Sequence, residues 1–330
     1  GESGKHLAFA GHIDVVPPGN EESWKYPPFS ATIVDGKLYG RGAEDMKGSV
    51  ACFISATSSF IKKYGHDFGG QLSFIITGDE EREAVNGTKK MMEWAKNNNV
   101  VFNHCIVGEP TSNKMVGDKI KIGRRGSINF FITVKGVQGH TANSQRAENP
   151  AHFLITLLNN IISKPLDDGS EFFLPSSIQV PTFDVGNSAA NVIPEFARAT
   201  VNIRFNDIHS VESLTKWFQD NIDRVFANFP KASCTFKTDQ VGESYLTNPD
   251  QLCSLVSTAI REVSGKNSIP EMSTDGGTSD ARFIKNYCEV LELGLVNRTL
   301  HQVNEHVNLS DLKELHDIYL RILENYFKKN

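Results

Sequence analysis

Three carboxylates stand in a row at Asp79-Glu80-Glu81, directly after an apolar run at residues 72–76. That run is typical of a short buried strand. Neighbouring acids repel one another and are costly near a core unless a cation or a proton-transfer role stabilises them. The alternative is an acidic first turn of a following helix, which the helix dipole favours. The stretch alone leaves both interpretations open.

Histidine and carboxylate residues recur at the ends of other predicted elements. They are His12 and Asp14 after a strand at 6–10, Asp45 before a helix at 48–64, Glu109 after a strand at 104–107, and His301 in a loop. Asp45 alone could equally be a helix N-cap. Ligands of open α/β sheets bind beyond the carboxyl ends of the strands, so we expect these residues to meet there.

This set offers imidazole and carboxylate ligands without thiolates, which suits a catalytic divalent ion such as Zn²⁺, Mn²⁺ or Co²⁺. His12 and Asp14 project to the same side of an extended segment, so the carboxylate can orient the ring. Two ions about 3.5–4 Å apart need a bridging carboxylate. One further carboxylate must remain free as general base, and Glu80 and Glu81 could divide these tasks.

The composition is that of an ordinary soluble globular protein, with 39% hydrophobic and 22% charged residues among 330. The net charge of -5 gives no general attraction to nucleic acid or to anionic membranes. Five scattered cysteines without a C-x-x-C pair indicate a reducing compartment, and we expect the cytoplasm. No stretch is apolar enough to span a bilayer, and no signal peptide is recognisable. The chain begins without Met almost directly at a strand, so we expect that its natural N-terminus is missing.

Two regions of different character are predicted. Alternating α/β patterns run to about residue 120 and return near 239. The α/β elements are a hairpin at 31–38 turning at Asp35-Gly36, helices at 87–97, 250–263 and 311–327, and a strand at 289–293. Between the two stretches, strands at 128–134, 178–185, 197–205 and 233–237 and helices at 149–162 and 211–226 give a β-α-β-β-α-β order, typical of a compact α+β unit.

Several polar residues of the middle region suit substrate recognition. Arg124, Arg125 and Arg204 are cations able to pair with carboxylates in a bidentate manner. His140 stands in a turn and could equally be a structural histidine. The Gly276-Gly277-Thr278-Ser279 loop lacks the lysine and the spacing of a phosphate-binding P-loop, so we do not interpret it as a nucleotide site.

Together these motifs resemble the M20 family of di-zinc peptidases and deacylases, over essentially the whole chain. The motifs are Gly11-His12-Ile13-Asp14-Val15-Val16-Pro17, Gly40-Arg41-Gly42-Ala43-Glu44-Asp45-Met46-Lys47-Gly48, Asp79-Glu80-Glu81, Gly108-Glu109-Pro110-Thr111 and the His301 loop. The segments at 121–127, 139–140, 191–194, 276–280 and 301–305 are similar to those of members that hydrolyse N-succinyl-LL-2,6-diaminopimelate. The chain departs from the common pattern at Arg82, Asn143 and Ala190, and family members usually begin with a further helix and strand.

The resemblance implies a mixed-sheet, zinc-peptidase-like catalytic domain at 1–125 and 239–330, with an inserted ferredoxin-like dimerisation or lid domain at 126–238. It implies that Asp45 bridges two metal ions, that Glu81 and His301 complete one site, and that His12 and Glu109 complete the other. Glu80 would be the general base, Asp14 would orient His12, and a cis peptide would follow Asp45. His140 would reach the active site of the other subunit of a homodimer. The implied substrate contacts are Arg124, Arg125, Asn191, Arg204, Gly277, Thr278 and Asn297.

The expected activity is therefore hydrolysis of an amide with the help of two bound metal ions, and the products are succinate and LL-2,6-diaminopimelate. Zn²⁺ is the expected metal, ahead of Co²⁺ and Mn²⁺. The alternatives are an acetylornithine deacetylase-like enzyme, another amino-acid deacylase or dipeptidase of the family, and a non-catalytic homologue. Paired arginines favour a dicarboxylic acyl group, because an acetyl group offers no carboxylate to bind.

Overall fold

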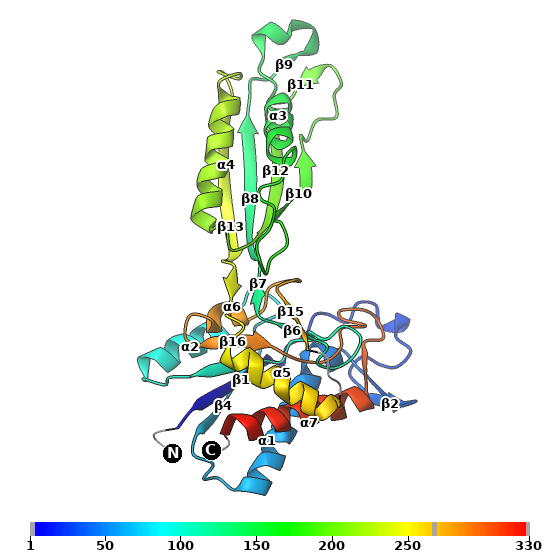
Figure 1. Cartoon of the computed structure of the whole chain (residues 1–330). Helices are drawn as coiled ribbons and strands as arrows, with labels where there is room; N and C mark the ends of the chain where they lie inside the picture. The colour runs from blue at the N-terminus through cyan, green and yellow to red at the C-terminus, as the bar shows by residue number, and fades with distance from the viewer. Residues whose placement is uncertain (1–3, 266–268, 328–330) are drawn as a thin grey trace. The chain divides into compact units, whose positions relative to one another are not determined.

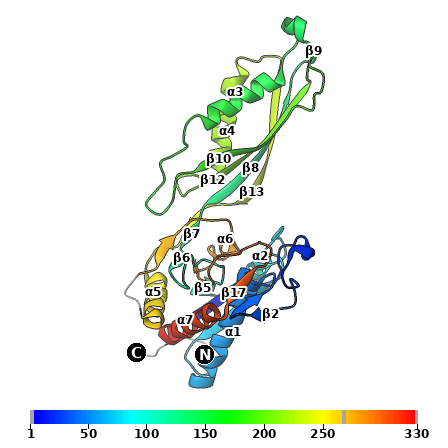
Figure 2. The same ribbon diagram turned by 90° about the vertical axis from the view of Figure 1, so that its right-hand side faces the viewer.

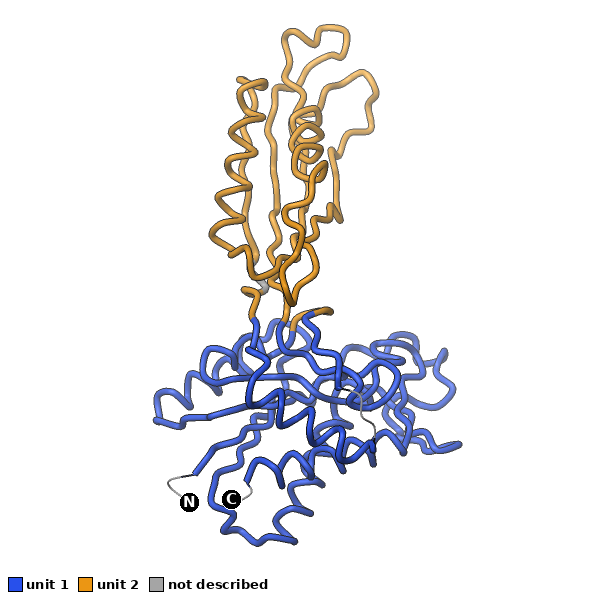
Figure 3. The backbone as a smooth tube through the Cα atoms, viewed as in Figure 1, with its two compact units in different colours: residues 1–123, 246–274, 279–330 blue, residues 124–245, 275–278 orange. Residues whose placement is uncertain are grey.

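The computed structural model describes residues 4–265 and 269–327. The chain forms two compact units, coloured separately in Figure 3. Unit 1 takes the described parts of 1–123, 246–274 and 279–330, and unit 2 takes 124–245 and 275–278. The predicted boundaries placed 124–125, 239–245 and 275–278 with the α/β part instead. The difference at 239 arises because the last strand of unit 2 continues to Gly242, where it still pairs with Ser127.

Unit 1 is built on a six-stranded sheet in the order β15-β6-β16-β5-β1-β4. Its strands are β15 (Glu271–Ser273), β6 (Lys119–Lys121), β16 (Glu289–Glu292), β5 (His104–Val107), β1 (His6–His12) and β4 (Gln71–Thr77). β1 is parallel to both β4 and β5, and β16 is parallel to β5, whereas β6 and β16 are antiparallel to each other. The sheet is therefore mixed, as predicted.

Helices cover the central strands, which explains their unbroken apolar sequences. Residues 7–10 of β1 are fully buried. The helices α1 (Gly48–Tyr64), α7 (Leu309–Phe327) and α5 (Gln251–Ser264) lie side by side (Figure 1). Phe9 of β1 stacks on Phe53 of α1 with ring centroids 4.2 Å apart, and meets Tyr319 of α7 edge-on. Helices α2 (Thr88–Asn97) and α6 (Ala281–Ile284) pack against each other.

Short elements complete unit 1. The predicted hairpin consists of β2 (Thr32–Val34) and β3 (Lys37–Tyr39), and β17 (His306–Asn308) adds a third strand to it. Its turn has positive φ at Asp35 and Gly36, as a two-residue hairpin turn requires. A 3-10 turn, η1, covers Glu21–Ser23, and a kinked segment, η2 (Ala43–Lys47), leads into α1. Where the chain passes between the units lie β7 (Gly123–Arg124) and β14 (Tyr245–Leu246), and Thr247 N donates to Ile122 O at 2.6 Å.

Unit 2 has a four-stranded antiparallel sheet in the order β10-β12-β8-β13. Its elements are β8 (Gly126–Lys135), β9 (Gly139–His140), η3 (Thr141–Arg146), α3 (Pro150–Ile162), β10 (Ser177–Asp184), β11 (Val192–Ile193), β12 (Phe196–Phe205), α4 (Val211–Phe226) and β13 (Ser233–Gly242). Both long helices lie on one face of the sheet (Figure 2). Phe130 of β8 stacks there on Phe218 of α4, with centroids 4.1 Å apart. The main elements follow the expected β-α-β-β-α-β order.

In the part of the chain that the structure describes, no helix is both long and apolar enough to cross a membrane.

Candidate metal centre

Three neighbouring parallel strands, β5, β1 and β4, end at the same edge of the sheet. His12 is the last residue of β1 and is paired in register with Thr77, the last residue of β4. Glu80 and Glu81 follow β4, and Glu109 follows β5. Parallel pairing therefore brings these side chains to one place although they are far apart in sequence.

Asp45 reaches the same place from the segment that precedes α1. Gly42 has a φ of 81°, and a Cβ there would lie 2.5 Å from Val15, so only glycine fits this bend. Asp45 itself has extended backbone angles, φ -119° and ψ 100°, and the Asp45–Met46 peptide is cis, as expected. The N-cap position of α1 is Lys47, without a side-chain cap. The N-cap interpretation of Asp45 is therefore wrong.

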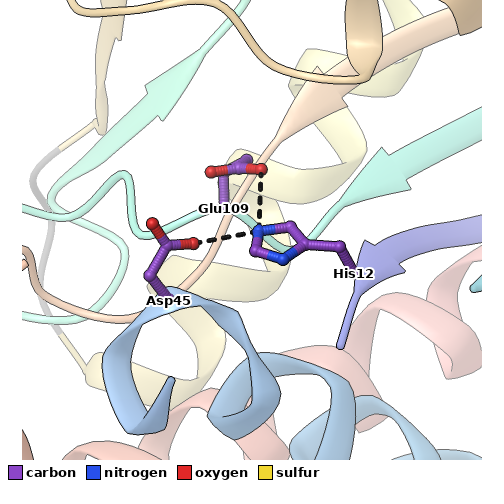
Figure 4. A group of neighbouring side chains, drawn as sticks. All are labelled: His12, Asp45 and Glu109. Atoms are coloured by element: carbon purple, nitrogen blue, oxygen red, sulfur yellow. Dashed lines mark hydrogen bonds and ion pairs between the residues drawn. The ribbon is translucent and has the colours of Figure 1, made fainter. Parts of the chain in front are cut away.

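The two oxygens of Asp45 face two different histidines. Oδ1 lies 3.1 Å from Nε2 of His12, and Oδ2 lies 3.2 Å from Nε2 of His301. Glu109 Oε1 is 3.8 Å from His12 Nε2 (Figure 4), and Glu81 Oε1 is 3.3 Å from His301 Nε2. Two three-residue clusters thus share Asp45, and in each the possible ligand atoms lie within 4.8 Å of one another.

The charges of the site are those of a group of buried acids around two imidazoles. Burial raises the pKa of Glu109 well above its usual range, and the carboxylates of Asp45 and Glu80 add to the rise. Burial disfavours the charged ring of His12, yet Asp45 and Glu109 outweigh it and raise its pKa to about 10. Burial also opposes ionisation of Asp45, but the two histidines lower its pKa to about 2. Buried carboxylates are stabilised by nearby positive charge, and divalent cations bind carboxylate oxygens and imidazole nitrogens. The site therefore fits divalent cations.

Asp14 contacts both His12 and the segment that carries Glu80 and Glu81. Nδ1 of His12 contacts the main-chain oxygen of Asp14 at 3.0 Å, whereas the Asp14 carboxylate is 3.6 Å away. The ring is therefore oriented by the main chain more closely than by the predicted carboxylate, and its Nε2 faces Asp45 and Glu109. Oδ2 of Asp14 instead accepts hydrogen bonds from the main-chain N–H groups of Glu80 and Glu81, both at 3.0 Å.

The interpretation of Glu80 and Glu81 as the first turn of a helix is wrong. Helix α2 begins only at Thr88, and the acids lie in an irregular segment. Asp79 stabilises this segment, because its Oδ2 accepts from the N–H groups of Val85 and Asn86 at 2.9 and 2.7 Å. Burial raises the pKa of Glu80 to about 7, with neighbouring carboxylates adding to the rise.

Three buried charged residues around Asp45 were not singled out by the sequence analysis. They are Arg41, Glu44 and Glu305, which are 4%, 0% and 0% exposed. All three lie inside the motifs that carry Asp45 and His301. Charged residues inside these short motifs, which turn tightly next to Asp45 and His301, are the signal that could have indicated them.

Two of the predicted substrate residues, Arg125 and Arg204, form a cationic pair in unit 2. Arg125 and Arg204 are close enough that burial and the charge of Arg125 together lower the pKa of Arg204. Nε of Arg125 is buried without a hydrogen-bond partner among the described residues. Arg124 Nη1 donates to the main-chain oxygen of Gly277 at 2.6 Å, beside Thr278. Asn297 belongs to unit 1, where its N–H donates to Ser112 O at 2.9 Å.

His140 lies at the far end of unit 2 from this cationic pair. β9 pairs with β11, and Thr141 N donates to Asn191 O at 3.1 Å, so His140 and Asn191 are near neighbours. The exposed His140 ring accepts a hydrogen bond from Ala142 N through Nδ1. Strand β8 separates this end from the arginines, as Figure 1 shows, and its ten residues span about 30 Å.

The sequence pattern of Peptidase family M20/M25/M40 matches residues 8–325. The chain belongs to this family. The succinyl-diaminopimelate desuccinylase of Parvibaculum lavamentivorans is 48% identical over 327 residues, which cover 99% of this chain and 81% of that protein.

Solved structures of two peptidases share the fold. The aminopeptidase PepT of Bacillus cereus superimposes with a TM-score of 0.79 at 16% identity, covering 99% of this chain and 82% of that one. The Bacillus subtilis YXEP protein, described as a dinuclear metal-binding peptidase of family M20, superimposes with a TM-score of 0.70 at 15% identity, covering 98% and 82%. At such identities the likeness of this M20 chain to both concerns the fold alone.

Proposed function

We propose that this chain is a di-metal amide hydrolase that cleaves N-succinyl-LL-2,6-diaminopimelate to succinate and LL-2,6-diaminopimelate. The observation that best supports a di-metal hydrolase is the shared carboxylate of Asp45, which faces one histidine with each oxygen. The desuccinylase relative, 48% identical, supports the substrate. In this role the enzyme would serve lysine and cell-wall precursor synthesis, in the cytoplasm, where its five unpaired cysteines stay reduced.

His12, Asp45 and Glu109 would hold one divalent ion, and Asp45, Glu81 and His301 the other. Zn²⁺ suits these ligands best, with Co²⁺ and Mn²⁺ as alternatives. When bound, the ions supply Lewis-acid polarisation of the amide carbonyl and lower the pKa of a water molecule.

Glu80 is the residue that moves the proton. It lies beside the proposed ligands, and its main chain is fixed by Asp14, so its carboxylate has a defined place. A carboxylate that is not itself a ligand can first accept a proton from water and then pass it to the leaving amine. Asp14 is a positioning residue for both His12 and Glu80.

Arg125 and Arg204 would bind the free carboxylate of the succinyl group. Two neighbouring cations, one with an unpartnered buried Nε, are stabilised by an anion between them. Arg124, Gly277, Thr278 and Asn297 would contact the remainder of the substrate, and Asn191, a near neighbour of His140, would contact it from the partner subunit. An acetyl group could not use the arginine pair, which is why acetylornithine deacetylation is the second candidate and not the first.

Arg204→Met is expected to raise the KM for succinyl-diaminopimelate by about 10- to 100-fold, because one charge-assisted contact is lost. Steady-state kinetics with succinyl-diaminopimelate and acetylornithine measure the effect. Arg198→Met is the matched control, since Arg198 is an exposed arginine on the same strand β12. If the unmodified enzyme prefers acetylornithine, the proposed substrate is wrong.

We also propose that the enzyme is a homodimer in which His140 acts on the partner's site and stabilises the developing oxyanion. The separation of His140 from the arginines of its own unit supports this, because about 30 Å of strand lies between them. The proposed dimerisation and lid role of unit 2 rests on the same argument.

A complementation experiment tests the partner role. His140→Ala and Glu80→Gln homodimers should each be nearly inactive. The heterodimer, purified through two different tags, should regain about half the wild-type activity, because one of its two sites has both residues intact. A heterodimer as inactive as its parents would show that His140 serves its own chain.

A further inference from the structure

A buried ion pair joins the two segments that carry Asp45 and His301. Arg41 precedes Asp45 in the chain, and Glu305 follows His301. Nη1 of Arg41 donates to Oε2 of Glu305 at 2.6 Å, and the two side chains are 2% and 0% exposed. Apolar residues of similar volume are often at least as stabilising as a buried pair, so the pair by itself is weak evidence of a stabilising role. The pair does, however, hold main-chain groups next to Asp45 and His301.

The other oxygen of Glu305 fixes the main chain at Asp45. Oε1 accepts hydrogen bonds from the N–H groups of Glu44 and Asp45, at 2.9 and 3.3 Å. These bonds are made where Asp45 leaves helical backbone angles. Glu305 therefore determines the direction from which the shared carboxylate enters the site.

Arg41 acts in the same way on the loop of His301. Its Nη2 donates to the main-chain oxygen of His301 at 3.3 Å. A second link is parallel to it, because the Glu44 carboxylate accepts from both the N–H and the hydroxyl of Thr299, at 2.9 and 2.7 Å. His301 and Asn304 have φ values of 60° and 64°, which are uncommon for residues other than glycine. The contacts of Arg41 and Glu44 therefore hold this loop at His301 and Thr299.

The two histidines depend on these contacts to different degrees. His12 is 1% exposed at the end of the central strand β1, so packing on all sides fixes it. The side chain of His301 is 46% exposed, so its position follows that of its loop. Loss of the ion pair should therefore displace His301 much more than His12.

We propose that Arg41 and Glu305 are positioning residues that set the metal affinity of the Asp45–Glu81–His301 cluster, and much less that of the His12–Asp45–Glu109 cluster. The inference rests on the proposed function, since it takes both clusters as metal sites. Residues that orient ligands from outside commonly change metal affinity by about 10- to 100-fold.

Zn²⁺ affinities of the full chain, measured by competition with a chromophoric chelator, test the proposal. In Glu305→Gln and Arg41→Met, one of two Zn²⁺ equivalents should bind about 10- to 100-fold more weakly, while the other should weaken much less, because packing fixes His12. Turnover should fall at limiting Zn²⁺ and return at excess Zn²⁺, because neither residue takes part in the chemical step. If Glu305→Gln does not fold, Arg41→Lys serves as a second test. Lysine keeps the charge but lacks the fork that reaches both Glu305 and His301, so the same Zn²⁺ equivalent should bind more weakly.

Glu324→Gln is the matched control. Glu324 is also a buried carboxylate with a cationic partner, Lys63 at 2.7 Å, but it links α1 to α7 away from the ligand segments. Both Zn²⁺ equivalents should bind normally in it. The proposal is overturned if both equivalents keep their affinity in the Arg41 and Glu305 variants, or if both weaken equally together with a lower Tm. A wild-type chain that does not bind two Zn²⁺ equivalents would instead refute the proposed function itself.

Discussion

Replacing Glu80 with glutamine is expected to lower kcat by about 10²- to 10⁴-fold, the contribution of a positioned general acid–base group. Glutamine has nearly the same shape but cannot accept the proton of the attacking water. Because Glu80 is not among the proposed ligands, both metal equivalents should remain bound. Kinetics at saturating substrate, together with metal analysis of the same sample, separate the two effects.

Glu83→Gln controls for the loss of one negative charge from this segment. Glu83 is exposed in the same irregular stretch and should be replaceable without a change in kcat. Wild-type turnover of Glu80→Gln would remove Glu80 from the mechanism. Loss of bound metal from this variant would make Glu80 a ligand instead of a base.

Asp45→Asn is expected to weaken the binding of both metal equivalents, each by more than the roughly 100-fold that residues outside the ligand sphere can contribute. The reason is that the two clusters share this one carboxylate. A neutral amide supplies neither the charge nor two equivalent oxygens. Zn²⁺ titration followed by competition with a chelator gives the two affinities.

Glu109→Gln and Glu81→Gln are the matched comparisons, because each residue belongs to one cluster only. Each should weaken one equivalent and spare the other. If Asp45→Asn loses a single equivalent, the carboxylate does not bridge, and two separate sites would have to be considered.

The sequence indicates much of this centre because strand ends are local features. Parallel strands carry whatever follows them to one edge, so the amino-acid pattern alone is enough to bring His12 and Glu109 together. Strong local patterns also predict the bounds of single elements accurately. The predicted helix at 48–64 and the predicted strand at 104–107 coincide with α1 and β5.

Other features depend on tertiary contacts that no local pattern reports. The pairing of Arg41 with Glu305 joins residues more than 260 positions apart. The double role of Asp14 depends on main-chain N–H groups that β4 delivers, and these have no side-chain signature. The strands β15 and β17 have three residues each, too few for a periodic pattern, and they form because β6 and β3 each offer them a free edge.

One connection in the fold has a consequence for how such proteins can change. The chain leaves unit 1 after Gly123 and returns at Leu246, and the flanking residues Ile122 and Thr247 are hydrogen-bonded to each other. A unit whose cut ends meet can close over a short peptide at a small entropic cost. Apart from residues 275–278, which also belong to unit 2, the unit that carries the arginines and His140 could thus be exchanged as one continuous segment. One hydrolytic centre could be recombined with different recognition modules without disturbing its own core.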